Sequence, residues 1–145
     1  MGNAVSEKLI DAINAHDVER IVDLAADDFE LTDVATGETF RGKEGARRNI
    51  DGWFTPFPDL TCEIENLITS GEWEAIEAIG RGTQTGSITT PEGEIPPTGK
   101  KVEAKFVTIS RIRDGKVVEQ RDYYDLGTIM QQLGLMPEAM AATTG

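Results

Sequence analysis

The sequence predicts an α+β domain in which a strongly curved, mostly antiparallel sheet wraps around N-terminal helices. Apolar residues follow a helical period near the N-terminus, a short hairpin and one more helix come next, and long two-residue alternations fill most of the chain after Pro58. This order differs from the regular strand and helix alternation of parallel α/β folds. We expect a single domain over residues 1–145, with a frayed tail from about residue 138.

The composition is that of an acidic, folded domain. The 145 residues include 26 Asp and Glu against 14 Lys and Arg, for a formal net charge of −12. Such a surface repels phosphate backbones and anionic membranes, so we expect no nucleic-acid and no membrane partner. The acidity fits a salt-rich habitat as well as a general role in solubility. One cysteine, Cys62, excludes an internal disulfide, and the N-terminus lacks the pattern of a secretion signal, which favours the cytoplasm.

Two helices are expected at the N-terminus. Apolar residues at i, i+4 and i+8 predict a helix over about residues 4–15, capped by Asn3 or Ser6. Asp17 is a suitable N-cap for a second helix, which continues to Ala25.

A hairpin and a third helix should follow. Residues 29–34 alternate as a strand, turn, and return through 39–41. The apolar face of residues 43–54 then predicts a helix, which the prolines at 56 and 58 end.

The rest of the chain is typical of long strands. We expect a loop rich in Gly and Pro within them, and a closing helix after them. The predicted strands are 60–65, 73–85, 102–112 and 117–124, the loop is 86–100, and the helix covers 126–133.

One face of the 73–85 strand carries small residues. Gly80 and Gly82 share a side with Ile76, Ala78 and Gln84, and glycine leaves space where a core side chain would stand. A curved sheet would enclose this space. We therefore expect a pocket, with Gln84 either donating a hydrogen bond to a substrate oxygen or serving as a satisfied core amide.

The order of elements resembles the cone-shaped α+β barrel shared by ketosteroid isomerase, scytalone dehydratase and nuclear transport factor. Within that superfamily the chain is similar to the SnoaL-like polyketide cyclases, or ester cyclases, to about residue 135. The segments that carry the likeness are 14–17, 82–86, 95–100, 113–117, 120–123 and 132–134.

The resemblance implies a cofactor-free cyclase that closes a ring by intramolecular aldol condensation. The acid/base aspartate of these cyclases stands on the last strand, which matches Asp122. The cyclases commonly carry histidines at the positions of Gln84 and Thr108, where this chain has other residue types.

Asp122 is also the strongest catalytic candidate from the residues themselves. It lies inside a predicted strand next to two tyrosines, although aspartate is disfavoured in strand interiors. Because burial of an unpaired carboxylate is costly, a pocket role fits Asp122 better than an arginine pair or a strand-end cap. A dry pocket would raise its pKa and suit proton transfer beside a carbonyl near neutrality.

The partners of Asp122 depend on the turn at 114–115. A two-residue turn pairs Thr108 with Arg121 and turns it away from Asp122, whereas a three-residue loop with a bulge at Gly115 pairs Thr108 with Gln120. We favour the second register because it separates an apolar inner face from a charged outer face. The substrate-binding candidates on the inner face are Phe106, Thr108, Gln120 and Tyr124.

Aromatic and acidic residues elsewhere complete the candidate set. Trp53 and Phe54 are expected either to line the pocket with Tyr124 and Phe106 for a planar ligand or to form plain core. Asp33 is either a second pocket acid or, as we favour, a solvated turn residue.

Two further polar residues receive structural interpretations. Asp125 is expected to cap the closing helix, and His16, the single histidine, to serve in a turn or cap. One histidine and one cysteine do not supply an ordinary zinc site, so we expect no metal.

The leading hypothesis is a cofactor-free enzyme for a hydrophobic, carbonyl-bearing small molecule. The alternative is a non-catalytic binding or carrier domain of the same fold. An epoxide hydrolase with an Asp-Arg-Asp set is disfavoured, because no Arg-x-Asp pair shares a strand face. Apolar residues interrupt the charged outer face of the sheet, which predicts a homodimer; they are Ala75, Ile79, Val107 and Ile109.

Overall fold

The computed structural model describes residues 4–136 and confirms the α+β class. No helix within this range is both long and apolar enough to cross a membrane. The elements in chain order are α1 (Val5–Asn14), α2 (Val18–Asp23), β1 (Ala25–Asp33), β2 (Glu38–Arg41), α3 (Gly42–Phe54), β3 (Thr61–Ser70), β4 (Trp73–Thr83), β5 (Ile88–Thr90), β6 (Gly93–Ile95), β7 (Lys101–Arg113), β8 (Lys116–Tyr124) and α4 (Leu126–Gln132).

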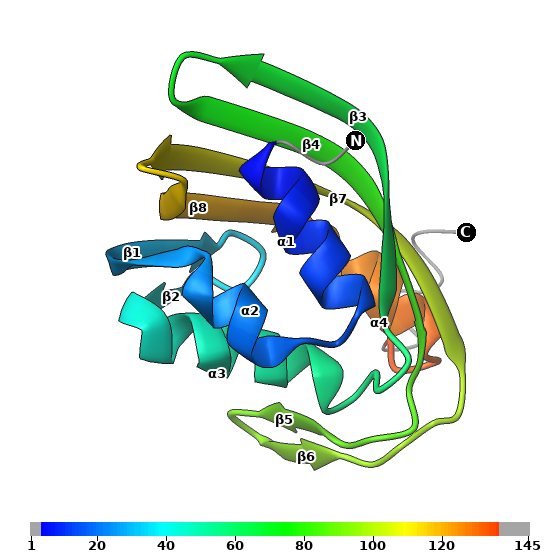
Figure 1. Ribbon diagram of the computed structural model, residues 1–145. Helices are drawn as coiled ribbons and strands as arrows, with labels where there is room; N and C mark the ends of the chain where they lie inside the picture. The colour runs from blue at the N-terminus through cyan, green and yellow to red at the C-terminus, as the bar shows by residue number, and fades with distance from the viewer. Residues whose placement is uncertain (1–3, 137–145) are drawn as a thin grey trace.

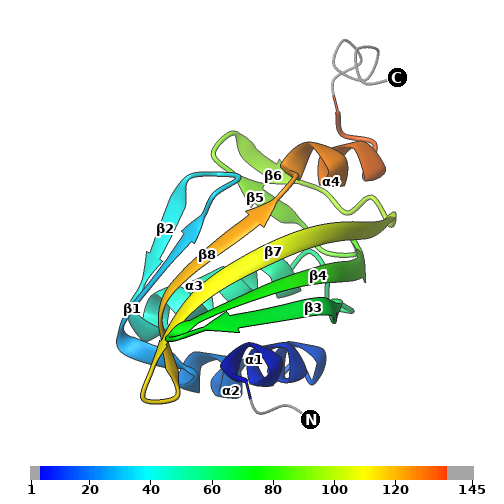
Figure 2. The same ribbon diagram turned by 90° about the horizontal axis from the view of Figure 1, so that it is seen from above.

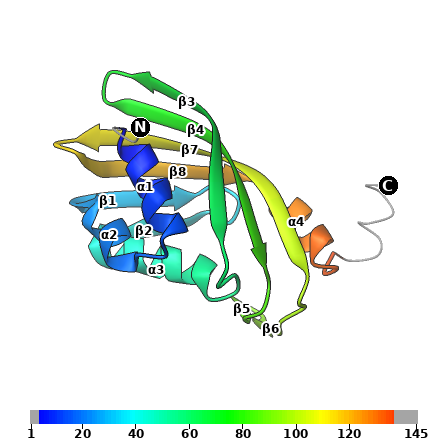
Figure 3. The same ribbon diagram turned by 45° about the vertical axis from the view of Figure 1, so that its right-hand side comes forward.

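Six strands form one curved sheet in the order β2-β1-β8-β7-β4-β3. Neighbouring strands are antiparallel except for β1 and β8, which run parallel. The helices α1, α2 and α3 lie on the concave side (Figure 1), and the long strands bend around them (Figure 3). Figure 2 shows α4 and the β5–β6 hairpin at the end of the molecule away from α1 and α2. This is the cone-shaped arrangement expected from the sequence.

The first helix is fixed at its N-terminus by a strand residue. The carboxylate of Glu74, on β4, accepts hydrogen bonds from the backbone N–H groups of Val5 and Ser6 at 3.2 and 2.7 Å. Ala4 occupies the N-cap position. The expectation that Ser6 caps this helix is therefore wrong, because Ser6 lies inside the first turn; Asn3 lies outside the described residues.

The end of α1 is tied to the edge strand β3. The side-chain amide of Asn14 donates to the Cys62 carbonyl at 2.9 Å and accepts from the Cys62 N–H at 2.7 Å. His16 follows in a left-handed turn with φ 54°, and its Nε2 lies 2.8 Å from the Leu60 carbonyl. The histidine is thus a turn residue, as predicted.

The chain enters β1 earlier than the sequence suggested. Asp17 caps α2 by accepting from the Arg20 N–H at 3.1 Å, but the helix ends at Asp23 and does not reach Ala25. The Val117 N–H donates to the Leu24 carbonyl at 2.8 Å. This contact starts the parallel pairing with β8, so Ala25 is already part of a strand.

The register between β7 and β8 corrects both sequence alternatives. Asp114 and Gly115 form a two-residue turn with φ values of 53° and 73°, which is typical of hairpins. A bulge follows, because the pairing passes from Ile112 with Val117 to Arg111 with Glu119. Without this bulge, the two-residue turn would place Thr108 and Asp122 on opposite faces of the sheet. The extra residue brings both side chains to the same face, and Thr108 pairs directly with Asp122.

Candidate active site

A cavity of about 150 Å³ lies between the concave face of the sheet and the helices α1 and α3. Its wall is mostly apolar. Space beside the glycine-spaced face of β4 was expected, and both Gly80 and Gly82 line this cavity. Added Cβ atoms there would lie 3.6 Å from the Phe106 ring and 3.1 Å from Phe57, so these two rings fill part of the space.

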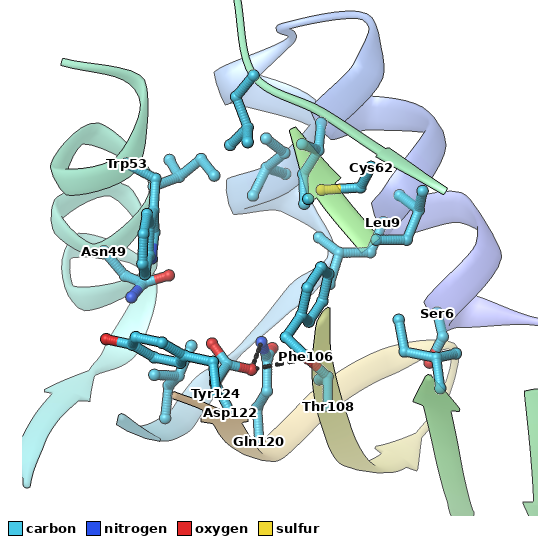
Figure 4. Close-up of a pocket in the computed structure, with 18 of the residues that line it drawn as sticks. Ser6, Leu9, Asn49, Trp53, Cys62, Phe106, Thr108, Gln120, Asp122 and Tyr124 are labelled. Atoms are coloured by element: carbon cyan, nitrogen blue, oxygen red, sulfur yellow. Dashed lines mark hydrogen bonds between the residues drawn. The ribbon is translucent and has the colours of Figure 1, made fainter. Parts of the chain in front are cut away.

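Asp122 is the acidic residue on the cavity wall, where it retains some accessible surface. Its Oδ1 accepts hydrogen bonds from the Thr108 hydroxyl at 2.9 Å and the Gln120 amide at 3.0 Å (Figure 4). Its Oδ2 makes no hydrogen bond with any residue in the range 4–136. One carboxylate oxygen is therefore held in place, and the other is available to a ligand.

The surroundings of Asp122 favour its protonated form. Burial raises the pKa of this carboxyl from 3.8 to about 6, and the nearby Asp33 carboxylate adds to the rise. The hydrogen bonds from Gln120 and Thr108 oppose it, because they stabilise the anion. A carboxyl with a pKa of about 6 exchanges protons readily near neutral pH.

Asp33 is buried, which corrects the expectation of a solvated turn residue. It is 7% exposed and pairs in register with Asp122 on the neighbouring strand. Its Oδ2 accepts from the Tyr124 hydroxyl at 2.7 Å, and its Oδ1 accepts from the Thr36 N–H at 3.1 Å. Asp33 is not one of the residues that line the cavity, but it orients Tyr124, which is.

Aromatic rings form one side of the cavity. The ring of Trp53 meets that of Tyr124 edge to face, with centroids 5.3 Å apart, and Phe106 also lines the space. Burial and the hydrogen bond to Asp33 raise the pKa of Tyr124, so its hydroxyl keeps its proton. Phe54 lies elsewhere, because its ring stacks on His16 at a centroid distance of 4.6 Å.

Gln84 stands outside the cavity, against the sequence expectation. Strand β4 ends at Thr83, so the alternation that placed Gln84 beside the glycines does not continue. Its amide is fully used: Nε2 donates to the Gly86 and Pro96 carbonyls, and Oε1 accepts from the N–H and the hydroxyl of Thr98. Gln84 is 0% exposed and holds the loop around the β5–β6 hairpin.

Several polar residues that line the cavity were not identified from the sequence, among them Asn49, Cys62 and Ser6. Asn49 lies one helical turn before Trp53 on α3, so the shared helical face was a usable signal. Figure 4 shows its side chain across from Asp122. Cys62 contributes its thiol, whose pKa burial raises to about 11. Ser6 lines the cavity from the first turn of α1.

The polar residues here do not form a metal site. Within residues 4–136 there is no group of three His, Cys, Asp or Glu side chains placed to hold a metal ion. The site instead combines a carboxyl with a raised pKa, two hydrogen-bond donors that orient it and an apolar, partly aromatic wall. These features suit a planar organic ligand.

Comparison with known proteins gives a consistent result. The family described as SnoaL-like polyketide cyclase matches residues 3–133. No protein with a curated description matches this chain significantly.

Solved structures of similar proteins share the fold. A Jannaschia protein assigned as a SnoaL-like polyketide cyclase is 25% identical, with a TM-score of 0.80 over 92% of this chain and 91% of that one. IdmH of Streptomyces antibioticus, assigned as a polyketide cyclase, is 30% identical, with a TM-score of 0.73 over 90% and 96%. A Catenulispora acidiphila protein with a ketosteroid isomerase-like fold, in complex with trimethylamine, is 20% identical, with a TM-score of 0.78 over 94% and 96%.

Proposed function

Because the chain belongs to the SnoaL-like polyketide cyclase family, we propose that it is a cofactor-free enzyme in which Asp122 is the general acid/base. Its substrate is a hydrophobic small molecule that carries a carbonyl. The observation that supports this most is the carboxyl of Asp122, which lies on an apolar cavity with a pKa of about 6 and one unengaged oxygen.

The proposed step is proton removal from the carbon next to the substrate carbonyl. Oδ2 of Asp122 takes the proton, and the C–H electron pair moves into the enolate. In a cyclase the enolate carbon then attacks a second carbonyl of the same molecule, a C–C bond forms, and the new alkoxide takes the proton back from Asp122. In an isomerase the proton returns to a different carbon. Neither path needs a redox partner, because no net oxidation occurs.

The neighbouring residues orient this chemistry. The bonds from Thr108 and Gln120 fix Oδ1 and leave Oδ2 directed at the ligand. Asn49 makes no hydrogen bond with another described residue, so its amide N–H is free to donate to the enolate oxygen as negative charge develops there. The Tyr124 hydroxyl is engaged by Asp33, and its ring therefore serves as a wall for a planar substrate.

Isotope exchange tests the acid/base role without knowledge of the natural substrate. The methyl protons of 2-acetylnaphthalene in D₂O should exchange in the presence of the wild-type protein, as followed by proton NMR. Asp122→Asn should slow this exchange about 100-fold or more, in line with the usual effect of general acid/base catalysis. Equal exchange by the wild type and the Asn variant would rule out the role of Asp122.

The second candidate function is a non-catalytic binding or carrier domain. The observation that favours it is Thr108, which stands beside Asp122 where the similar cyclases commonly have a histidine. A wild type that binds 2-acetylnaphthalene and aromatic polyketide esters, yet neither exchanges nor cyclises them, would support this reading over the enzyme.

We also propose a homodimer through the convex face of the sheet. Ala75 and Ile109 pair across β4 and β7, Val107 pairs with Tyr123, and these four side chains keep exposed surface next to one another. Ile79 is already buried within the chain. Light scattering at micromolar concentration should give a dimer for the wild type and a monomer for Val107→Glu, whereas a monomeric wild type would contradict the proposal.

A further inference from the structure

The cavity has a second polar point on α1. Ser6 is 2% exposed and lines the cavity. Among residues 4–136, its Oγ is the one buried side-chain nitrogen or oxygen without a hydrogen-bond partner. An unpaired buried hydroxyl is unfavourable, because the group has lost its contact with water and gained nothing in return. The hydroxyl of Ser6 therefore calls for a physical explanation.

Helix formation does not supply one. The backbone N–H groups of Val5 and Ser6 already donate to Glu74, so Oγ of Ser6 has no capping task in the first turn. Alanine has a higher helix propensity than serine and would bury no polar atom at this place. Serine is thus the less favourable choice for the stability of the ligand-free protein.

The position of Ser6 on α1 places it on the cavity wall. Four residues of this helix line the cavity at the spacing i, i+3, i+4 and i+7, which is a single helical face. Ser6 is the polar member of that set, and the other three are aliphatic: Leu9, Ile10 and Ile13.

Ser6 and Asp122 lie at opposite sides of the cavity. The bond to Glu74 places Ser6 near β4, and Ile76 of β4 pairs with Thr108 of β7, which pairs with Asp122 of β8. Adjacent strands lie about 4.8 Å apart, so β4 and β8 are separated by about 10 Å. Figure 4 shows Ser6 on the side away from Asp122 and Tyr124.

We propose that the Ser6 hydroxyl binds a second polar group of the ligand, at the end away from the carbonyl that Asp122 serves. The substrate class is then a planar molecule with an apolar middle, a ketone or ester carbonyl at one end, and a hydroxyl or carbonyl at the other. The assignment of the carbonyl end to Asp122 rests on the proposed function, whereas the contact with Ser6 does not.

Two matched ketones isolate the contact. In 2-acetyl-6-hydroxynaphthalene the acetyl and hydroxyl groups stand at opposite ends of a two-ring plane, and 2-acetyl-6-methylnaphthalene replaces the hydroxyl by a methyl of similar size. Equilibrium affinities for both are measured by calorimetry with the wild-type chain, Ser6→Ala and the control Ser70→Ala. Ser70 is an exposed serine at the end of β3, so its variant loses the same group away from the cavity.

The preference for the hydroxyl ketone over the methyl ketone should fall about five- to tenfold in Ser6→Ala, as one neutral hydrogen bond predicts. Ser70→Ala should keep the wild-type preference. Ser6→Ala should also resist urea as well as the wild type or better, because it removes an unpaired group.

Three results would overturn the proposal: an unchanged preference in Ser6→Ala, a wild type that binds neither ketone, or a clear loss of stability in Ser6→Ala. The last would mean that the hydroxyl is already bonded within the protein. Failure of the proposed function would give a different result. Asp122→Asn would then leave the rate of proton exchange unchanged, while Ser6→Ala would still reduce the preference for the hydroxyl ketone.

Discussion

Replacement of Asp122 by asparagine should stabilise the protein above pH 6 even as it removes the acid/base group. In the folded chain the pKa of Asp122 is about 6, compared with 3.8 for an ordinary aspartate. Between these values the folded state binds more protons than the unfolded state, so the contribution of Asp122 to stability falls as pH rises. At about 1.4 kcal/mol for each pKa unit, the carboxylate costs the folded state roughly 3 kcal/mol above pH 6.

Asparagine avoids this cost, because it stays neutral at every pH. Its side-chain oxygen still accepts from Thr108 and Gln120, but its N–H₂ group takes the place of Oδ2 without a described partner. The net gain above pH 6 should therefore be about 1–3 kcal/mol in the free energy of unfolding. Near pH 4, where the wild-type carboxyl is protonated in the folded state, the gain should largely disappear.

Urea denaturation of both proteins at pH 4, 6 and 8 measures this difference. Carboxylates that do not interact with Asp122 contribute equally in the two proteins, so their effects cancel. Asp125→Asn is a control of opposite sign, because hydrogen bonds from Thr128 and Gly127 lower the pKa of the exposed Asp125. Its carboxylate adds stability above the unfolded pKa, and this stability is lost as pH falls through the folded pKa. A stability difference for Asp122→Asn that does not vary with pH, or a wild type that is the more stable at pH 8, would refute the reasoning.

Two further outcomes follow from the site. Turnover should fall as pH drops through about 6, where Asp122 takes up its proton, and it should stay constant through neutrality. The single histidine, His16, contacts the Leu60 carbonyl and does not line the cavity. Initial rates across the pH range test this, and a second transition near neutrality would contradict control by a single carboxyl. Gln84→Leu should lower the free energy of unfolding by about 2–4 kcal/mol, because it leaves the buried partners of the amide unpaired. Urea denaturation measures this loss, with Gln131→Leu as an exposed control. A Gln84→Leu variant of unchanged stability would show that the loop does not depend on this amide.

The fold and the position of Asp122 on the cavity wall were predictable because the signals are local. The change of period after Pro58, the glycines of β4 and an aspartate within an aromatic strand can each be recognised in a few residues. The last-strand position of the aspartate agreed with the family resemblance. The register between β7 and β8 was not predictable in the same way, because a short turn and a bulge at Val118 offset each other.

The missed and misplaced residues depend on contacts that are distant in sequence. Asp33 is buried because Tyr124 reaches it from the far end of the chain. Gln84 leaves the cavity because Thr98 and Pro96 fold back over it. The sequence favoured a capping role for Ser6, because serine is common near helix starts and the cavity beneath it is formed by distant parts of the chain.

Helix α1 is anchored to the sheet at both ends, which fixes the length of the cavity along this helix. Glu74 holds the first turn to β4, and Asn14 holds the last turn to Cys62 on β3. Val5 and Asn14, at the two ends of this ten-residue helix, are nine positions apart (14 − 5), which corresponds to a rise of about 13–14 Å. One inserted or deleted residue would rotate the far part of the helix by about 100°, so either an anchor or the lining stripe would leave its place. The number of residues in α1 thus fixes the length of the cavity along this helix, whereas substitutions of the lining residues can change the width and polarity of the cavity.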